Sequence, residues 1–149
     1  MGRRTVFVID DDDSTRAHLA VLLSALGYEV AQAASGPEAL SRFAAGDLPA
    51  LVMLDLILPG LGGLQVLDRL KTSYPQIPVV ILSAVGQIRT VVDAMNRGAS
   101  DYLAKPVQEA ELSIALESAL EKQRLREEVR VPFLLPRSST VQPPSDQPI

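Results

Sequence analysis

The sequence predicts an α/β protein built on a five-stranded parallel sheet with helices on both faces. Two observations support this fold class. Short segments that are apolar at nearly every position recur along the chain, as in strands buried on both faces. Amphipathic segments with helical spacing follow each of them, giving a β-α alternation repeated five times, which favours a parallel sheet with right-handed crossovers.

The first strand is predicted at residues 6–9, which are apolar throughout. A helix follows it, with Asp13 or Ser14 as the expected N-cap and Gly27 just after its end. The apolar stripe of this helix has i, i+3, i+4, i+7 spacing and consists of Leu19, Leu22, Leu23 and Leu26.

Residues 28–33 and 51–54 are the second and third predicted strands. The helix between them begins with the capping-box pattern of Ser35 and Glu38. The third strand ends at Asp55, and the loop after it is rich in glycine and proline.

The second half of the chain repeats the alternation. A helix with Leu64, Leu67 and Leu70 leads to a fourth strand at 79–82. A helix from about Ile88 stops at Gly98, a fifth strand covers 102–104, and a long helix starts near Gln108.

We expect residues 4–121 to form one domain, 122–131 to extend the last helix, and 132–149 to be a Pro/Ser-rich linker or disordered tail. Leu125 and Val129 have i, i+4 spacing in the extension. The extension is therefore either a solvated helix end or a dimerising or signalling helix.

Composition narrows the function classes. The 149 residues carry a formal net charge of −4, which argues against direct nucleic-acid contact by this chain. The absence of cysteine excludes disulfides and thiolate metal sites and suits a cytoplasmic protein. No segment approaches the length of a membrane span.

Polar residues stand where four of the predicted strands end. Asp10 and Asp11 follow the first strand, Asp55 the third, Ser83 the fourth and Lys105 the fifth. In an open α/β sheet, ligands bind beyond these carboxyl ends, so we expect the five side chains to lie at one edge.

The chemistry of this set favours phosphoryl transfer to an aspartate. Three adjacent carboxylates need a cation, and oxygen-only ligands suit Mg²⁺. A carboxylate beside Mg²⁺ can attack a phosphoryl group, while Lys105 and Ser83 supply a charge and a hydroxyl for its oxygens.

Four stretches resemble the receiver domain of bacterial two-component response regulators: VIDDDDSTR, LVMLDLILPGLGGLQVL, VVILSA and GASDYLAKP. The resemblance covers residues 4–121. It implies a flavodoxin-like (βα)5 fold with strand order 2-1-3-4-5. Two stretches, DLILPGLGGLQVL and AVGQIRTVVDAMNRGASDYLAKPV, are most similar to receivers that precede an ATPase and a DNA-binding domain in transcriptional activators.

The resemblance also implies roles for individual residues. Asp55 matches the phospho-acceptor, and Asp10 and Asp11 match the acidic pair that holds Mg²⁺ with Asp55 and the Ile57 carbonyl. Ser83 matches a switch hydroxyl that contacts the phosphoryl group together with Lys105.

Two further features follow from the match on the last strand. Tyr102 matches an aromatic switch residue, and the Lys105–Pro106 peptide bond matches one that is usually cis. The implied partner is a sensor histidine kinase, and the surface formed by the fourth helix, fifth strand and fifth helix would change its partner preference on phosphorylation. A phosphorylation-linked homodimer is a further expectation.

Two other functions remain open on the sequence. A Mg²⁺-dependent phosphatase of the haloacid-dehalogenase type also uses a strand-end aspartate, but it carries a second acid where this chain has Ile57. A phosphorylation-independent binding module would leave the site unused. Asp12 and Asp13 are interpreted as residues of the helix start, and His18 as a surface residue.

Overall fold

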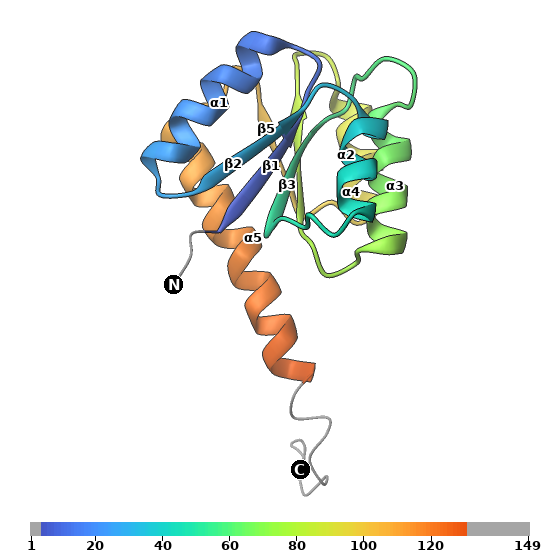
Figure 1. The fold of residues 1–149 in the computed structure, drawn as a ribbon. Helices are drawn as coiled ribbons and strands as arrows, with labels where there is room; N and C mark the ends of the chain where they lie inside the picture. Colours follow the sequence, from blue (N-terminus) through green and yellow to red (C-terminus); the bar gives the residue numbers. More distant parts are fainter. Residues whose placement is uncertain (1–3, 131–149) are drawn as a thin grey trace, which may run out of the picture.

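The computed structural model describes residues 4–130, with side chains described as far as Leu125. Ten elements alternate strictly between strand and helix (Figure 1). They are β1 (Thr5–Ile9), α1 (Asp13–Ala25), β2 (Glu29–Ala33), α2 (Gly36–Ala44), β3 (Leu51–Asp55), α3 (Gly63–Ser73), β4 (Val79–Ser83), α4 (Ile88–Asn96), β5 (Asp101–Ala104) and α5 (Glu109–Arg130).

The five strands form one parallel sheet in the order β2-β1-β3-β4-β5, which confirms the flavodoxin-like topology. The register aligns the strand ends: Ile9 of β1 is opposite Leu54 of β3, and Ser83 of β4 is opposite Ala104 of β5. The carboxyl ends of all five strands therefore meet at one edge of the sheet, which we call the carboxyl edge.

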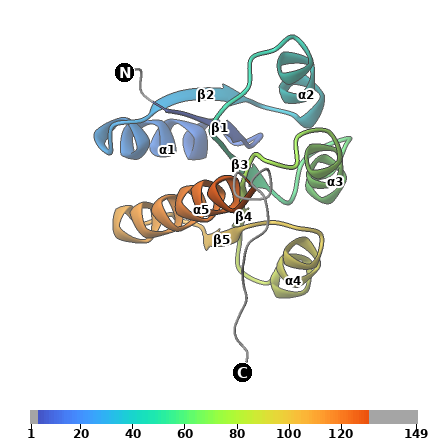
Figure 2. The same ribbon diagram turned by 90° about the horizontal axis from the view of Figure 1, so that it is seen from below.

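Helices cover both faces of the sheet, α1 and α5 on one and α2, α3 and α4 on the other (Figure 2). Successive residues of each strand point alternately towards the helices on one face of the sheet and those on the other. Phe7 and Ile9 belong to the core beneath α2, α3 and α4, and Val6 and Val8 belong to the core beneath α1 and α5. Every residue of β3 and β4 is buried, which explains their continuous apolar sequence.

The start of α1 differs from the prediction. Its N-cap is Asp12, whose side chain accepts a hydrogen bond from the Ser14 amide, and Asp13 is already the first helical residue. The predicted caps, Asp13 and Ser14, are therefore wrong. Each of these residue types can cap a helix, so the sequence did not discriminate between neighbouring positions. Ser35 caps α2 as predicted, accepting from the Glu38 amide.

Helix α5 begins close to the predicted position and is continuous to Arg130 (Figure 1). Its body-facing residues are Leu112, Ala115, Leu116, Ala119 and Leu120, all of them buried. The segment expected as a tail, 132–149, lies outside the described residues. Among the helices that the structure describes, none has the length and apolarity needed to cross a bilayer.

Gly63, the first residue of α3, lies directly against the end of β3. A Cβ at this position would lie 2.5 Å from the Asp55 carbonyl oxygen and from the Leu56 Cα. These are backbone atoms that cannot rotate away, so the close approach of α3 to the strand requires glycine here. At Gly62, by contrast, the nearest atom to an added Cβ is the Gln65 Oε1 at 3.9 Å.

We expect Gly63→Ala to lower the free energy of unfolding by about 2–3 kcal/mol, because the added methyl group overlaps the backbone that follows Asp55. Gly62→Ala is the matched control: it changes the N-cap of α3 without a backbone overlap and should lower the free energy of unfolding by at most about 1 kcal/mol. Urea denaturation followed by circular dichroism measures both. Equal stabilities of the two variants would contradict the packing argument.

Candidate functional site

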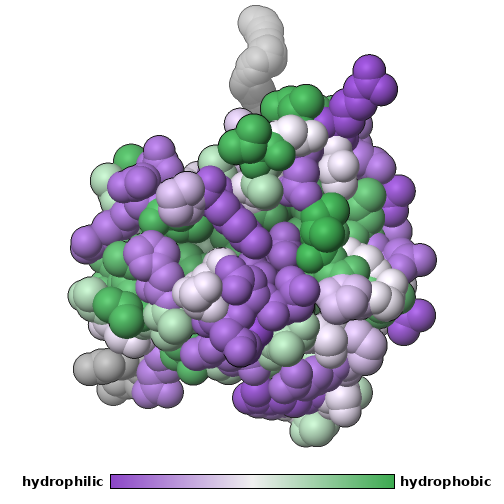
Figure 3. All heavy atoms as spheres, turned by 90° about the horizontal axis from the view of Figure 1, so that it is seen from above, coloured by the Kyte–Doolittle hydropathy of each residue, from purple (hydrophilic) through white to green (hydrophobic). Residues whose placement is uncertain are grey.

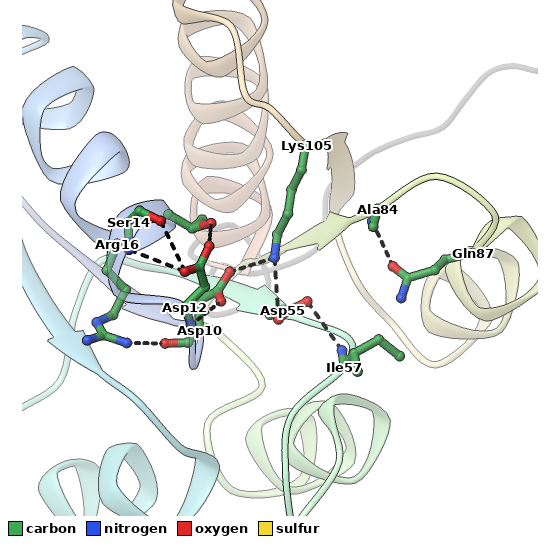
Figure 4. A network of polar contacts seen from close by, with 10 residues as sticks. Asp10, Asp12, Ser14, Arg16, Asp55, Ile57, Ala84, Gln87 and Lys105 are labelled. Atoms are coloured by element: carbon green, nitrogen blue, oxygen red, sulfur yellow. Dashed lines mark hydrogen bonds and ion pairs between the residues drawn. The ribbon is translucent and has the colours of Figure 1, made fainter.

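The carboxyl edge brings together Asp10 just after β1, Asp55 at the end of β3 and Lys105 just after β5 (Figure 4). The Lys105 ammonium lies 2.8 Å from Asp10 Oδ2 and 3.4 Å from Asp55 Oδ2. Asp10, Asp55 and Ser83 are the three buried polar or charged residues of the described chain. The predicted convergence of separate strand ends into one cluster is therefore present.

Asp10 is completely buried, and its polar atoms are held from several directions. Its amide donates to the Ala33 carbonyl at 3.2 Å, and its Oδ1 accepts from the Asp12 amide at 2.9 Å. Oδ2 has the Lys105 ammonium as an ion-pair partner but accepts no well-oriented hydrogen bond. A buried carboxylate oxygen in this condition has capacity for a further positive ligand.

The electrostatics of the site favour protonation of Asp55. Burial, followed by the negative charge of Asp10, raises the pKa of Asp55 to about 6, although the Lys105 ammonium and the hydrogen bond from the Ile57 amide oppose the shift. The pKa of Lys105 is also raised. Burial alone would lower it, but contacts with Asp10 and Asp55 outweigh burial and raise the pKa above its ordinary value. The ammonium therefore stays charged near neutral pH.

Carboxylate oxygens of Asp10, Asp11 and Asp55 all lie within 4.8 Å of one another. Asp11 is exposed, whereas the other two are buried, so the cluster opens to solvent on one side. This donor set fits Mg²⁺, which takes one or two carboxylates at short distance and keeps several waters. The incompletely bonded Asp10 Oδ2 supports the same assignment.

The other predicted site residues occupy distinct places around this cluster. Ser83 ends β4 as a buried residue, and its carbonyl accepts from the Lys105 amide at 2.8 Å. The Ile57 amide donates to Asp55 Oδ1 at 3.2 Å, which fixes the Asp55 carboxylate.

Tyr102 lies on the edge strand with 44% of its surface exposed. The Lys105–Pro106 peptide bond is cis, as the sequence led us to expect.

The four consecutive aspartates, 10–13, have different contact partners. Asp10 and Asp11 contribute to the cluster, whereas Asp12 accepts from Ser14 and Thr15 at the start of α1. These hydrogen bonds, the one from the Thr15 side chain above all, lower the pKa of Asp12. Asp13 pairs with Arg16.

Three contacts near the site were not predicted. Arg16 Nη1 donates to the Asp10 carbonyl at 2.6 Å, and Gln87 Oε1 accepts from the Ala84 amide at 2.7 Å (Figure 4). His18 Nε2 lies 3.1 Å from the Val107 carbonyl, joining α1 to the loop after Lys105, although His18 is exposed as predicted. No sequence pattern indicates these three contacts strongly, because Arg16, Gln87 and His18 lie in or beside a helix, where a solvated side chain is the usual expectation.

Figure 3 views the molecule from the side of the carboxyl edge. Hydrophilic residues gather across the middle of this face, with hydrophobic residues around them. Exposed apolar side chains on α4 are Ile88, Val92 and Met95, and Val85 in the preceding loop is almost fully exposed.

The chain combines a flavodoxin-like (βα)5 fold with an acidic cluster and a lysine at the carboxyl edge, and comparison with known proteins assigns the family. The model of the response regulator receiver domain matches residues 6–117. The chain belongs to the receiver domains of two-component response regulators.

Curated relatives include transcription-related regulators. The nitrogen assimilation regulatory protein NtrX of Azorhizobium caulinodans is 39% identical over 127 residues, which cover 84% of this chain and 28% of that protein. The regulatory protein AtoC of Escherichia coli is 31% identical over 126 residues, covering 84% and 27% of the two chains. The chain therefore spans little more than a quarter of the length of these relatives.

Solved structures agree with this assignment. NtrX from Brucella abortus superposes with a TM-score of 0.82 at 37% identity, over 87% of this chain and 29% of that one. The isolated receiver domain of the same protein matches with a TM-score of 0.74 at 39% identity, over 78% and 98% of the chains. The similarity to NtrX thus includes nearly the whole of its isolated receiver domain.

The raised pKa of Asp55 predicts a pH-dependent stability difference in Mg²⁺-free buffer. The folded state binds the Asp55 proton up to about pH 6, whereas the unfolded chain releases it near 3.8. Ionised Asp55 therefore costs stability above about pH 6 and costs nothing below about pH 4. Asp55→Asn should be more stable than wild type by about 2–3 kcal/mol near pH 8, with the gain disappearing as the pH falls towards 4.

Urea denaturation at a series of pH values measures this difference. Asp47→Asn is the control, because Asp47 is an exposed carboxylate paired with Arg42 at the surface. A stability gain of Asp55→Asn that does not vary between about pH 4 and 8 would show that the Asp55 charge is not the cause.

Proposed function

We propose that the chain accepts a phosphoryl group on Asp55 from the phosphohistidine of a sensor histidine kinase. The observation that carries this proposal is the position of the buried Asp55 carboxylate, beside Asp10 and the Lys105 ammonium at an edge open to solvent. The receiver family supplies the expected donor. We further propose that residues 4–121 form the receiver unit, with 122–131 as its helical extension.

The proposed reaction is a displacement at phosphorus. An Asp55 carboxylate oxygen forms a bond to phosphorus as the bond from the histidine nitrogen breaks, and the released imidazole takes its proton from solvent. The Ile57 amide already holds the other oxygen of Asp55, so the carboxylate is oriented before the reaction. The Lys105 ammonium and the Ser83 hydroxyl would receive the charge of the transferred oxygens.

Asp10, Asp11, Asp55 and the Ile57 carbonyl are the proposed ligands of Mg²⁺. When bound, the ion neutralises charge on the transferring phosphoryl oxygens. It would also offset the repulsion between the carboxylates, which in its absence share the Lys105 ammonium.

We propose that phosphorylation changes the surface formed by α4, β5 and α5. Ser83 immediately precedes the loop to α4, and Tyr102 is exposed on β5. If the phosphoryl group draws the Ser83 hydroxyl inward, the space it leaves becomes available to Tyr102. The exposed apolar residues of α4 lie on the same surface, so a partner controlling transcription, or a second copy, could distinguish the two states.

Incubation with acetyl phosphate and Mg²⁺ tests the acceptor. Mass spectrometry should show one added phosphoryl group in wild type and in Asp47→Asn, and none in Asp55→Asn. Sustained turnover of a generic phosphomonoester would instead favour the phosphatase. Phosphorylation of Asp55→Asn to the same extent as wild type would contradict the assignment of the acceptor.

The residues flanking the site predict slow loss of the phosphoryl group. Ile57 and Val85 are apolar and 59% and 97% exposed, so neither can orient an attacking water by a hydrogen bond. The double variant Ile57→Asn, Val85→Glu should lose the phosphoryl group several-fold faster than wild type. Decay is measured after removal of acetyl phosphate, and an unchanged or slower decay would contradict this explanation.

A further inference from the structure

Arg16 bonds to the peptide group that joins two of the proposed Mg²⁺ ligands. It is the fourth residue of α1, and its Nη1 donates to the Asp10 carbonyl at 2.6 Å. That carbonyl belongs to the peptide unit between Asp10 and Asp11. The orientation of this peptide plane determines how the two carboxylates are placed relative to each other.

The contact is held rigidly from the helix side. The Arg16 side chain is only 15% exposed, and its second guanidinium nitrogen pairs with Asp13, one turn earlier on the same helix. The planar guanidinium can hold both partners at once because its donors have a fixed geometry. Arg16 therefore fastens the loop after β1 to the first turn of α1.

The guanidinium contacts the Asp10 main chain and leaves its carboxylate to other partners. The Asp10 carboxylate oxygens are engaged by the Asp12 amide and the Lys105 ammonium. In the described part of the chain, the carboxylate paired with Arg16 is that of Asp13. Arg16 thus supports the acidic cluster without occupying the oxygens that a metal ion requires.

From this arrangement we infer that Arg16 is a positioning residue for Mg²⁺ binding: it fixes the Asp10–Asp11 peptide group so that both carboxylates meet the ion's strict geometry. The inference rests on the proposed function, since it takes Asp10 and Asp11 as Mg²⁺ ligands. Mg²⁺ demands near-ideal octahedral geometry, so a loosened loop costs affinity. Partners that orient metal ligands commonly change metal affinity by 10–100-fold when removed.

The sign of the effect separates positioning from simple electrostatics. Removing a positive charge near a cation site should strengthen cation binding if only charge matters. Removing a residue that orients the ligands should weaken it. Arg16→Ala is therefore expected to bind Mg²⁺ about tenfold more weakly than wild type, against the electrostatic trend.

The chain offers a closely matched control at the neighbouring strand. Arg42 on α2 also donates to a main-chain carbonyl, that of Gln32 in β2, and pairs with the Asp47 carboxylate. Arg42→Ala removes the same two kinds of contact and, in addition, a cation–π contact with the Phe7 ring of β1, while leaving every hydrogen bond of the Asp10–Asp11 loop in place. Its dissociation constant for Mg²⁺ should stay within about twofold of wild type.

The experiment titrates MgCl₂ into the ¹⁵N-labelled, unphosphorylated chain and follows the amide shifts by NMR. Asp11→Ala serves as the reference variant that loses the site. Unfolding midpoints without Mg²⁺ are measured in parallel, because a merely structural role for Arg16 would lower the midpoint and leave the affinity of the folded protein unchanged. If Arg16→Ala does not fold, Arg16→Lys replaces it and should also bind more weakly, because an ammonium lacks the planar fork.

Unchanged or tighter Mg²⁺ binding by the folded Arg16 variants, with wild type binding normally, would overturn the inference and leave the proposed function intact. Equal weakening by Arg42→Ala would also overturn it, because the effect would then be general. Failure of the wild-type protein to bind Mg²⁺ would overturn both.

Discussion

The structure depends on two desolvated carboxylates, Asp10 and Asp55, that share the Lys105 ammonium at the carboxyl edge. Two negative charges against one positive charge leave the buried site short of positive charge, and exposed Asp11 adds to the deficit. Burial first, and then the charge of Asp10, raise the pKa of Asp55. A site in this condition responds strongly to whatever brings or removes charge, which is the property a phosphoryl-controlled domain needs.

The fold tolerates this shortage of positive charge because β3, β4 and α3 hold the charged residues in place by close packing. β3 and β4 are buried along their whole length, so the backbone that carries Asp55 and Ser83 has apolar packing on both faces. Gly63 lets α3 lie against the main chain just after Asp55. Packing of this density holds the carboxylate in place at the cost of leaving it poorly solvated.

The sequence was sufficient to predict the order of the elements and the convergence of Asp10, Asp55, Ser83 and Lys105, because buried parallel strands have a plain apolar pattern and their ends must meet at one edge. It was insufficient where the outcome depends on distances of a few ångströms. The N-cap moved to Asp12 because several adjacent residues were equally suitable. The contact of Arg16 with a main-chain carbonyl has no pattern of its own, since one arginine in the first turn of a helix looks the same whether it is solvated or buried.

Helix α5 has a geometric consequence beyond the site. It begins just after the loop that carries Lys105 and runs without interruption for 22 residues, about 33 Å, past the opposite edge of the sheet (Figure 1). The buried stripe includes Leu112, Leu116 and Leu120, and beyond it the partly exposed Gln123 donates its side-chain amide to the Gln76 carbonyl at 2.9 Å. Packing of this stripe against the sheet therefore sets the rotation of α5 about its own axis. Any structure continuous with the last turns of α5 is held at a fixed rotation, and at a fixed distance from the aspartates of the carboxyl edge.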